Sequence, residues 1–369
     1  MYIMTPLPPL ITSGVSDSNA PNIAMNEPNF LSSVSAISES PLHPYQLGAS
    51  LYMPATREDI WAVISRSKLP NLDSVIICLE DAVSESDVPY AWSNIQKLLS
   101  HWASVQQDTP LSVSRSQCVN QIDEATGVQI SAVQKSNRPL VFIRPRNPQM
   151  LMQLAALPNI NLVDGYVLPK VDMDSLSNWR LACQQVQEDS LLMPTLETGR
   201  LFDPAHNQAL ATALAHAFDE RVFALRIGGN DLFSALRLRR PSTQTIYETP
   251  VGTLMHQLIG TFVPQGYYLT APVCEYFDNT ALFIQELATD VSLGLVGKTV
   301  IHPAQIALVQ QAFSVSTRVL EEAQAILAQD AKAVFKHNNT MLEPATHYAW
   351  AVQTVKRAQI FGVLANQML

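Results

Sequence analysis

Eight short runs of apolar and β-branched residues, each followed by a stretch with helical spacing, constrain the fold of this chain more than any other feature. Strands that alternate with helices form parallel sheets, and eight such units match a closed barrel better than an open, doubly wound sheet. The sequence therefore predicts an α/β fold of the (β/α)₈ TIM-barrel type. The eight runs are ASLYMPA, SVIICLEDA, LVFIRPRN, DGYVLPKV, LLMPTLET, RVFALRIGGND, YYLTAPV and VGKTVIHP.

The segments on either side of the predicted barrel, residues 46–313, have different patterns. Residues 1–45 are rich in Pro, Ser and Asn and lack periodicity, which predicts an extended or mobile N-terminal segment. Residues 314–369 carry apolar positions at helical spacing, which predicts extra C-terminal helices beyond those of eight units. Helices with this much apolar surface must bury it on their own barrel or on that of a neighbouring subunit.

Composition and charge exclude several classes of protein. The net charge of -9 argues against nucleic acid or an acidic membrane surface as the main partner. No apolar run reaches the roughly 18 residues that a membrane-spanning helix requires. The first Lys or Arg is Arg57, so the N-terminus lacks the charged region of a secretory signal, and we expect a cytoplasmic protein. The four cysteines are widely spaced without a CxxC pair, which favours neither a zinc site nor a disulfide framework.

Charged residues follow nearly every predicted strand. The second run, VIICLEDAV at residues 75–83, is an apolar strand that ends in two adjacent carboxylates. In a barrel of this type the active site lies at the carboxyl ends of the strands, so these residues are candidates for function. Carboxylates beside cations on one rim are what a site for a divalent metal and an anionic substrate needs. The candidates are Arg57, Glu80, Asp81, Arg144, Arg146, Lys170, Glu197, Asp231, Glu275, Asp278, Lys298 and His302.

The spacing of these residues suggests a chemistry. Glu197 and Asp231 follow neighbouring strands and are placed to share one cation. The planar fork of an arginine, here Arg144 or Arg146, suits a carboxylate, and a hard cation stabilises an enolate. Two roles stay open for Lys170, as a Schiff-base nucleophile or as an ion-pair partner and substrate contact. His302 is either a general base or, as we favour, a structural or substrate-positioning residue.

Several of these segments resemble the citrate lyase β-subunit-like branch of the HpcH/HpaI aldolase superfamily, over roughly residues 48–313. The matching pieces are LYMPATR, CLEDAV, IRPRN, LPKV with TLET, and GGNDL followed by GKTVIHPAQI. The resemblance implies Mg²⁺ bound by Glu197 and Asp231, with Arg144 on the substrate carboxylate and enolate. It implies that Glu80 and Asp81 order water and cation around the metal.

The resemblance also implies a function. We expect a Mg²⁺-dependent carbon–carbon lyase or aldolase acting on a 2-oxo or 3-hydroxy carboxylic acid, or on its CoA thioester. It implies a homo-oligomer in which the C-terminal segment reaches over the barrel mouth of an adjacent subunit. Further residues near the strand ends are expected to bind the substrate: Pro54, Arg57, Arg146, Lys170 and His302.

Two departures from the family pattern keep alternatives open. The segment QLGASLYMP lacks the basic residues that precede the first strand in family members that use acyl-CoA. The loop ALRLRRP is more basic than in the family, and it is either a solvated loop, an oligomer contact, or a pocket for a phosphate or polycarboxylate. The alternative functions are phosphoenolpyruvate-type phosphoryl transfer on a related barrel and a non-catalytic binding or scaffold barrel.

Overall fold

The computed structural model of the protein describes residues 42–108, 118–122, 129–133 and 138–364, with side chains for 42–106 and 138–364. The predicted N-terminal segment, residues 1–45, therefore lies almost entirely outside the described residues. The described chain opens with a short 3₁₀ helix, η1 (Pro44–Leu47), which leads directly into the first strand.

Eight parallel strands form one sheet in the order β10-β1-β2-β5-β6-β7-β8-β9. A parallel bridge between Ala271 and Lys298 joins the two ends of this order, and the Ala271 N–H donates to the Gly297 carbonyl at 2.7 Å. The sheet is therefore closed, which confirms the predicted (β/α)₈ barrel. The strands are β1 (Gly48–Pro54), β2 (Ser74–Cys78), β5 (Leu140–Arg144), β6 (Gly165–Leu168), β7 (Leu191–Leu196), β8 (Leu225–Ile227), β9 (Leu269–Thr270) and β10 (Gly297–Val300).

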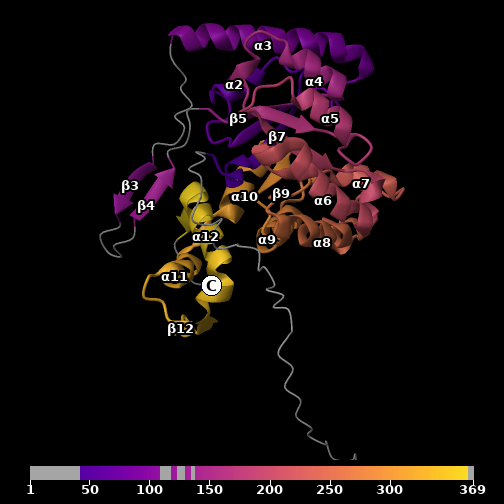
Figure 1. Ribbon diagram of the computed structural model, residues 1–369. Helices are drawn as coiled ribbons and strands as arrows, with labels where there is room; N and C mark the ends of the chain where they lie inside the picture. Colours follow the sequence, from indigo (N-terminus) through magenta and orange to yellow (C-terminus); the bar gives the residue numbers. More distant parts are fainter. Residues whose placement is uncertain (1–41, 109–117, 123–128, 134–137, 365–369) are drawn as a thin grey trace, which may run out of the picture. The chain divides into compact units, whose positions relative to one another are not determined.

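Helices follow the strands and cover the outside of the barrel (Figure 1). Two of them begin at a side-chain cap followed by proline: Asn147 accepts from the Met150 N–H at 2.9 Å, and Asp203 accepts from the Ala205 N–H at 2.9 Å. The helices are α2 (Ile60–Ile64), α3 (Val88–Asp108), α4 (Pro148–Ala155), α5 (Leu176–Cys183), α6 (Pro204–Phe218), α7 (Gly229–Ala235), α8 (Pro250–Phe262), α9 (Thr280–Ser292) and α10 (Ala304–Phe313).

The strands are buried on both faces, which explains why their sequences are near-continuous apolar runs. Every residue of β2 and of β5 is buried. Inside the barrel, Ile76, Phe142, Val167 and Met193 from the middle of four strands pack together. The alternate side chains point outward and form the larger core beneath the helices. Beyond α3, an antiparallel hairpin of β3 (Cys118–Ile122) and β4 (Gln129–Val133) precedes β5.

The C-terminal segment contains the predicted extra helices. Helices α11 (Thr317–Leu327) and α12 (Pro344–Phe361) pack against each other, with a small hairpin between them (Figure 1). The hairpin consists of β12 (Phe335–His337) and β13 (Thr340–Leu342). The short strand β11 (Val315–Ser316), which precedes α11, pairs with β14 (Val363–Leu364), which follows α12.

Helix α12 also packs on its own barrel. The Phe361 ring lies 6.3 Å from that of Tyr45 and 5.3 Å from that of Phe313, and Gln353 donates to the Tyr268 hydroxyl at 3.0 Å. Tyr45 and Tyr268 precede β1 and β9, so these contacts are at the amino end of the barrel. Helix α12 thus does not cover the carboxyl end of its own strands.

Among the helices of the described residues, we find none with the length and apolar character that crossing a membrane requires.

Candidate active site

Six charged side chains meet at the carboxyl end of the barrel. They come from the ends of five strands: Glu80 and Asp81 follow β2, Arg144 ends β5, and Lys170 follows β6. Glu197 follows β7, and Asp231 lies in the first turn of α7 after β8. Because parallel strands bring their carboxyl ends to one rim, residues far apart in the sequence become neighbours here.

Arg144 is the centre of this cluster. Its Nε and Nη2 donate to one oxygen of Glu80 at 2.9 and 2.6 Å. Its Nη2 also lies 3.2 Å from Asp81 Oδ2 and 3.1 Å from Glu197 Oε1. Burial opposes the charge of Arg144, but Tyr52, Glu197 and Glu80 together raise the pKa of its guanidinium above the usual range. One buried cation therefore links three carboxylates.

Lys170 uses both its backbone and its side chain. Its Nζ lies 2.6 Å from Glu80 Oε1, 3.6 Å from Asp81 Oδ1 and 4.0 Å from Asp231 Oδ1. Its backbone N–H donates to Glu197 Oε1 at 2.8 Å, in a left-handed conformation with φ of 52°. Burial lowers the pKa of the Lys170 amine, but the Glu80 hydrogen bond and charge outweigh it and raise the pKa. A Schiff-base nucleophile must be neutral, so this geometry favours the ion-pair role.

The carboxylates of the cluster have very different proton affinities. Burial raises the pKa of Glu80, but hydrogen bonding to Asp81 and the charges of Arg144 and Lys170 overcome it and bring the pKa to about 2. Burial and the neighbouring Glu80 raise the pKa of Asp81 to about 6. Burial also raises the pKa of Glu197 to about 7, with Arg144 opposing and the charge of Asp231 adding to the rise. Asp81 and Glu197 therefore bind protons more readily than ordinary carboxylates, whereas Glu80 stays ionised.

A glycine allows Glu197 to occupy its position. A Cβ atom on Gly228 would lie 2.3 Å from Glu197 Oε2, closer than any real contact. The GGND turn therefore brings its backbone against the Glu197 side chain, and only glycine permits this approach. This is a physical reason for the first glycine of the motif.

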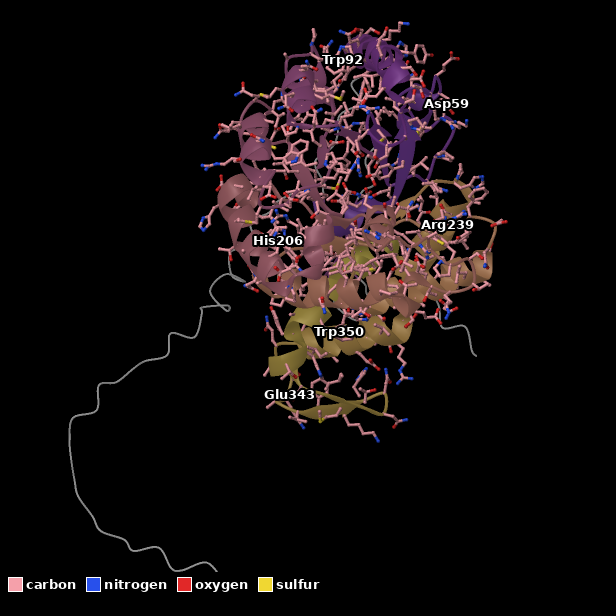
Figure 2. The ribbon with its side chains drawn as sticks, turned by 90° about the vertical axis from the view of Figure 1, so that its right-hand side faces the viewer. Asp59, Trp92, His206, Arg239, Glu343 and Trp350 are labelled. Carbon is pink, nitrogen blue, oxygen red and sulfur yellow. The ribbon has the colours of Figure 1, made fainter. Side chains whose placement is uncertain are left out.

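Two predicted arginines do not join the cluster. Arg57 is exposed and binds Asp59, with its Nε and Nη2 each 2.7 Å from a carboxylate oxygen; Asp59 lies at the periphery of the barrel (Figure 2). Arg146 binds Glu85 at 2.8 Å and the carbonyl of Val83. Strand β5 ends at Arg144, so the alternation that would place Arg146 on the same side no longer holds.

His302 and Pro54 lie at the same end of the barrel but contact other groups. The His302 ring stacks on Phe277 at 4.9 Å between centroids, and its Nδ1 accepts from the Ala304 N–H at 3.2 Å. Pro54 ends β1, and its carbonyl accepts from the Arg57 N–H at 3.1 Å. These two residues, like Arg57 and Arg146, make no hydrogen bond to the six-residue cluster within the described part of the chain. Their substrate contacts stay predictions.

Lys298 points away from the site, contrary to its predicted place on the rim. It is fully buried between β10 and α9, with its Nζ 2.8 Å from both Glu286 and Asp290. Arg240 also binds Glu286, and the Tyr247 hydroxyl donates to Asp290 at 2.5 Å. The side chain of Lys298 faces outward because strand residues alternate between the two faces of the sheet.

The same network accounts for part of the basic loop ALRLRRP. Arg240, the last arginine of the loop, is 3% exposed and donates to the Val273 carbonyl at 2.6 Å. Arg237 and Arg239 are exposed (Figure 2 labels Arg239). The most buried cation of the loop is therefore structural, and it does not line a substrate pocket.

Two residues near the cluster were not found from the sequence. Tyr52 in β1 accepts a hydrogen bond from Arg144 Nη1 at 3.3 Å. Arg226 in β8 is 2% exposed, and its guanidinium carbon lies 5.4 Å from the centre of the Tyr52 ring. The available signal was a charged residue inside an otherwise apolar strand, in ALRIGG.

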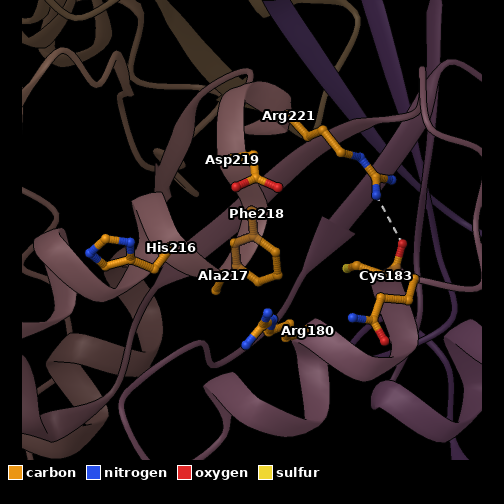
Figure 3. Close-up of a pocket in the computed structure, with 8 residues that line it drawn as sticks. Arg180, Cys183, His216, Ala217, Phe218, Asp219 and Arg221 are labelled. Carbon is orange, nitrogen blue, oxygen red and sulfur yellow. Dashed lines mark hydrogen bonds between the residues drawn. The ribbon is translucent and has the colours of Figure 1, made fainter.

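A cavity of about 150 Å³ lies elsewhere, among α5, α6 and the turn after α6 (Figure 3). Arg221 donates to the Cys183 carbonyl at 2.9 Å across this region, and His216 and Asp219 line it near Arg180. The turn after α6 leads into β8 and thus lies at the amino end of the strands. This cavity is therefore not part of the carboxylate cluster.

Comparisons with known proteins agree with this architecture. A family model described as "C-C_Bond_Lyase of the TIM-Barrel fold" matches residues 41–363. No curated protein sequence matches the chain. Among solved structures, CitE from Mycobacterium tuberculosis in complex with magnesium, acetoacetate and coenzyme A is 19% identical, with a TM-score of 0.57, covering 84% of this chain and 97% of CitE.

Two further solved structures match this chain. RipC from Yersinia pestis is 19% identical with a TM-score of 0.49, covering 74% of this chain and 98% of RipC. The citrate lyase beta subunit of M. tuberculosis, complexed with oxaloacetate and magnesium, is 18% identical with a TM-score of 0.48, covering 73% of this chain and 98% of that subunit. The family match over most of the chain confirms the predicted carbon–carbon lyase: this protein belongs to the family of C–C bond lyases of the TIM-barrel fold.

Proposed function

We propose that this lyase cleaves or forms a carbon–carbon bond of a 2-oxo or 3-hydroxy carboxylic acid through an enolate, with Mg²⁺ as its cofactor. The observation that supports this most is the cluster of four carboxylates around Arg144 and Lys170 at the carboxyl end of the barrel. Negative charge that develops on an enolate needs fixed positive charge in a site with little water. Arg144 and Lys170 provide such charge.

The residues present fit a magnesium ion. Oxygen ligands from one or two carboxylates, with other positions left to water and substrate, are typical of Mg²⁺ in proteins. Glu197 and Asp231 would supply these ligands. Burial, and to a smaller extent the charge of Asp231, raise the pKa of Glu197, and a bound cation would favour its ionised form. Within the described residues no group of three or more His, Cys, Asp and Glu side chains is arranged to hold a metal. Bound there, Mg²⁺ would act as a Lewis acid toward the substrate oxygens.

The residues of the chain would each have a distinct task. Arg144 would bind the substrate carboxylate, exchanging part of its present contact with Glu80 for the substrate. Lys170 would hold Glu80 and Asp81 in place and offset part of their negative charge. Asp81, with a pKa of about 6 and an exposed side chain, is suited to accept or release a proton near neutral pH.

The similarity to CitE supports the proposed substrate class. That protein binds magnesium, acetoacetate and coenzyme A. A small oxo acid would suit the rim described here, and a CoA thioester remains compatible with the proposal. The phosphoryl-transfer alternative loses support, because Arg240 of the basic loop is bound to Glu286 rather than directed at the rim.

We also propose a homo-oligomer whose C-terminal segment completes a neighbouring active site, in a cytoplasmic protein. In its own chain, α12 packs at the amino end of the barrel, and Trp350 on this helix is 43% exposed. Exposed aromatic side chains are common at protein interfaces.

The proposal is tested by exchange of substrate hydrogens with solvent. Enolate formation from pyruvate exchanges its C3 hydrogens in D₂O, which NMR detects without knowledge of the second substrate. Oxaloacetate, acetoacetate and acetyl-CoA extend the test to other oxo acids and to thioesters. We expect exchange above the metal-only rate that requires Mg²⁺ and is lost with EDTA.

The matched control is Glu197→Gln, which keeps the shape of the side chain and removes its charge. Exchange by the wild type but not by this variant supports the proposed site. Equal exchange with and without Mg²⁺, or none with any of these compounds, rejects the proposed function.

A further inference from the structure

Arg226 occupies the interior of the barrel directly below the candidate site. It is the central residue of β8, and its neighbours in register are Thr195 on β7 and Thr270 on β9. Thr195 is the second-last residue of β7, and Glu197 directly follows that strand at its carboxyl end. By this register, Arg226 lies deeper in the barrel than Glu197.

The contacts of Arg226 are unusual for a buried cation. It forms no ion pair with a carboxylate of the described residues; it donates to the Thr299 hydroxyl and lies against the Tyr52 ring. Its Nη1 and the hydroxyls of Thr195 and Thr270 are buried without a hydrogen-bond partner among the described residues. A protein with a buried charge of this kind is commonly no more stable than the same protein with a well-packed apolar residue at that position. Stability alone therefore does not account for Arg226.

Tyr52 connects Arg226 with the site. Its ring centre lies 5.4 Å from the guanidinium carbon of Arg226 and 6.0 Å from that of Arg144. Its hydroxyl accepts from Arg144 Nη1 at 3.3 Å. Two guanidinium groups thus contact one aromatic ring, and each is attracted to it electrostatically.

We propose that Arg226 is a positioning residue that holds the Tyr52 ring so that its hydroxyl orients Arg144. The inference rests on the proposed function, in which Arg144 stabilises the enolate. Without Arg226, the Tyr52 ring would lose one of its contacts inside the barrel, and Arg144 would lose the fixed position of one of its acceptors. A small misplacement of a group that stabilises the transition state reduces the rate more than the binding of substrate.

The test is Arg226→Met, studied by Mg²⁺-dependent pyruvate exchange and by thermal unfolding. We expect kcat to fall at least about tenfold and KM to change less than about threefold, with Tm unchanged or raised. A purely structural role would lower Tm and leave the rate per folded molecule unchanged. The matched control is Arg138→Met, because Arg138 is a buried arginine paired with Asp164 at 2.5 Å, near the start of β5. We expect Arg138→Met to have a lower Tm than the wild type and the same exchange rate.

A double-mutant cycle with Tyr52→Phe separates positioning through Tyr52 from a direct electrostatic effect. If Arg226 acts through Tyr52, the two substitutions together reduce kcat by less than the product of their separate effects. Wild-type exchange in Arg226→Met, or effects that multiply in the double variant, would overturn the inference. A wild-type protein that exchanges none of the test compounds rejects the proposed function itself, and with it the role of Arg226.

Discussion

Arg144 donates hydrogen bonds from both Nε and Nη2 to the same oxygen of Glu80, at 2.9 and 2.6 Å. A single carboxylate oxygen thus receives two donors, while Nη1 contacts Tyr52 at 3.3 Å. Arg144 is held from two sides, and its planar fork keeps a fixed orientation at the rim.

The first prediction concerns this fork. Arg144→Lys keeps the charge but replaces several directed donors with one ammonium group, so we expect the exchange rate to fall about 100-fold or more. Circular dichroism and Tm should stay near the wild-type values, because Lys can still pair with Glu80. Wild-type turnover in this variant would mean that the substrate carboxylate docks elsewhere.

The second prediction concerns the metal ligands. Saturating Mg²⁺ should raise the stability of the wild type by about 2 to 3 kcal/mol at 100 times its dissociation constant. Glu197→Gln and Asp231→Asn should each lose most of this gain in a thermal-shift titration. Asp278→Asn is the control, because Asp278 follows β9 at the same end of the barrel without contacting the cluster in the described structure. An undiminished Mg²⁺ effect in both ligand variants would contradict the assignment.

The third prediction is a pH dependence. The pKa of Glu197 is raised to about 7, so the folded state holds this proton more tightly than the unfolded state. The resulting stabilisation is complete below about pH 4.5 and is lost as the pH rises through 7. Without metal, the free energy of unfolding of the wild type minus that of Glu197→Gln should therefore fall between pH 5 and 8.

The comparison with Glu197→Gln is needed because other groups titrate as well. Burial lowers the pKa of His43 to about 4, and this residue adds stability as the pH rises through 4 to 6.5. Urea denaturation of both proteins in EDTA isolates the contribution of Glu197. A difference that rises with pH would contradict the pKa shift.

The fourth prediction concerns the buried network around Lys298. Lys298→Met leaves Glu286 and Asp290 with fewer positive partners in a dry environment, and we expect a loss of about 3 to 5 kcal/mol. The exchange rate per folded molecule should not change, since Lys298 faces away from the rim. Lys68→Met removes an exposed pair with Asp59 and should cost no more than about 1 kcal/mol. Equal losses in the two variants would refute the distinction.

The fifth prediction concerns assembly. We expect removal of the chain from about residue 315 to give a folded, monomeric protein without exchange activity. Size-exclusion chromatography with light scattering and the NMR assay measure both properties. Because truncation uncovers Phe313, the variant Trp350→Ser offers a milder test of the same surface. A truncated protein that keeps its assembly and its activity refutes a shared site.

The barrel and the core of the site could be predicted from the sequence for one physical reason. Buried parallel strands are apolar, so a charged residue at the end of such a run marks the rim, and closure of the barrel brings the rim residues together. Glu80, Arg144, Lys170, Glu197 and Asp231 meet for this reason.

The direction of a side chain was harder to predict. Arg57 and Arg146 follow the ends of their strands, where the backbone turns and nearby carboxylates compete for them. Lys298 lies within its strand, but the sequence does not reveal which face of β10 points outward. Arg226 was missed because a charged residue is not expected to face the interior of an apolar strand. Its environment became known only from its contact with Tyr52 in the structure.

The charges of the six-residue cluster imply an order of ligand addition. At a pH above the raised pKa values of Asp81 and Glu197, all four carboxylates are ionised, and together with the two cations Arg144 and Lys170 they leave two negative charges at the mouth of the barrel. An anionic substrate approaching the empty rim is repelled, whereas a divalent cation is attracted and reverses the sign of the local potential. Metal would therefore bind first and substrate second, and the affinity for substrate would depend on the concentration of metal.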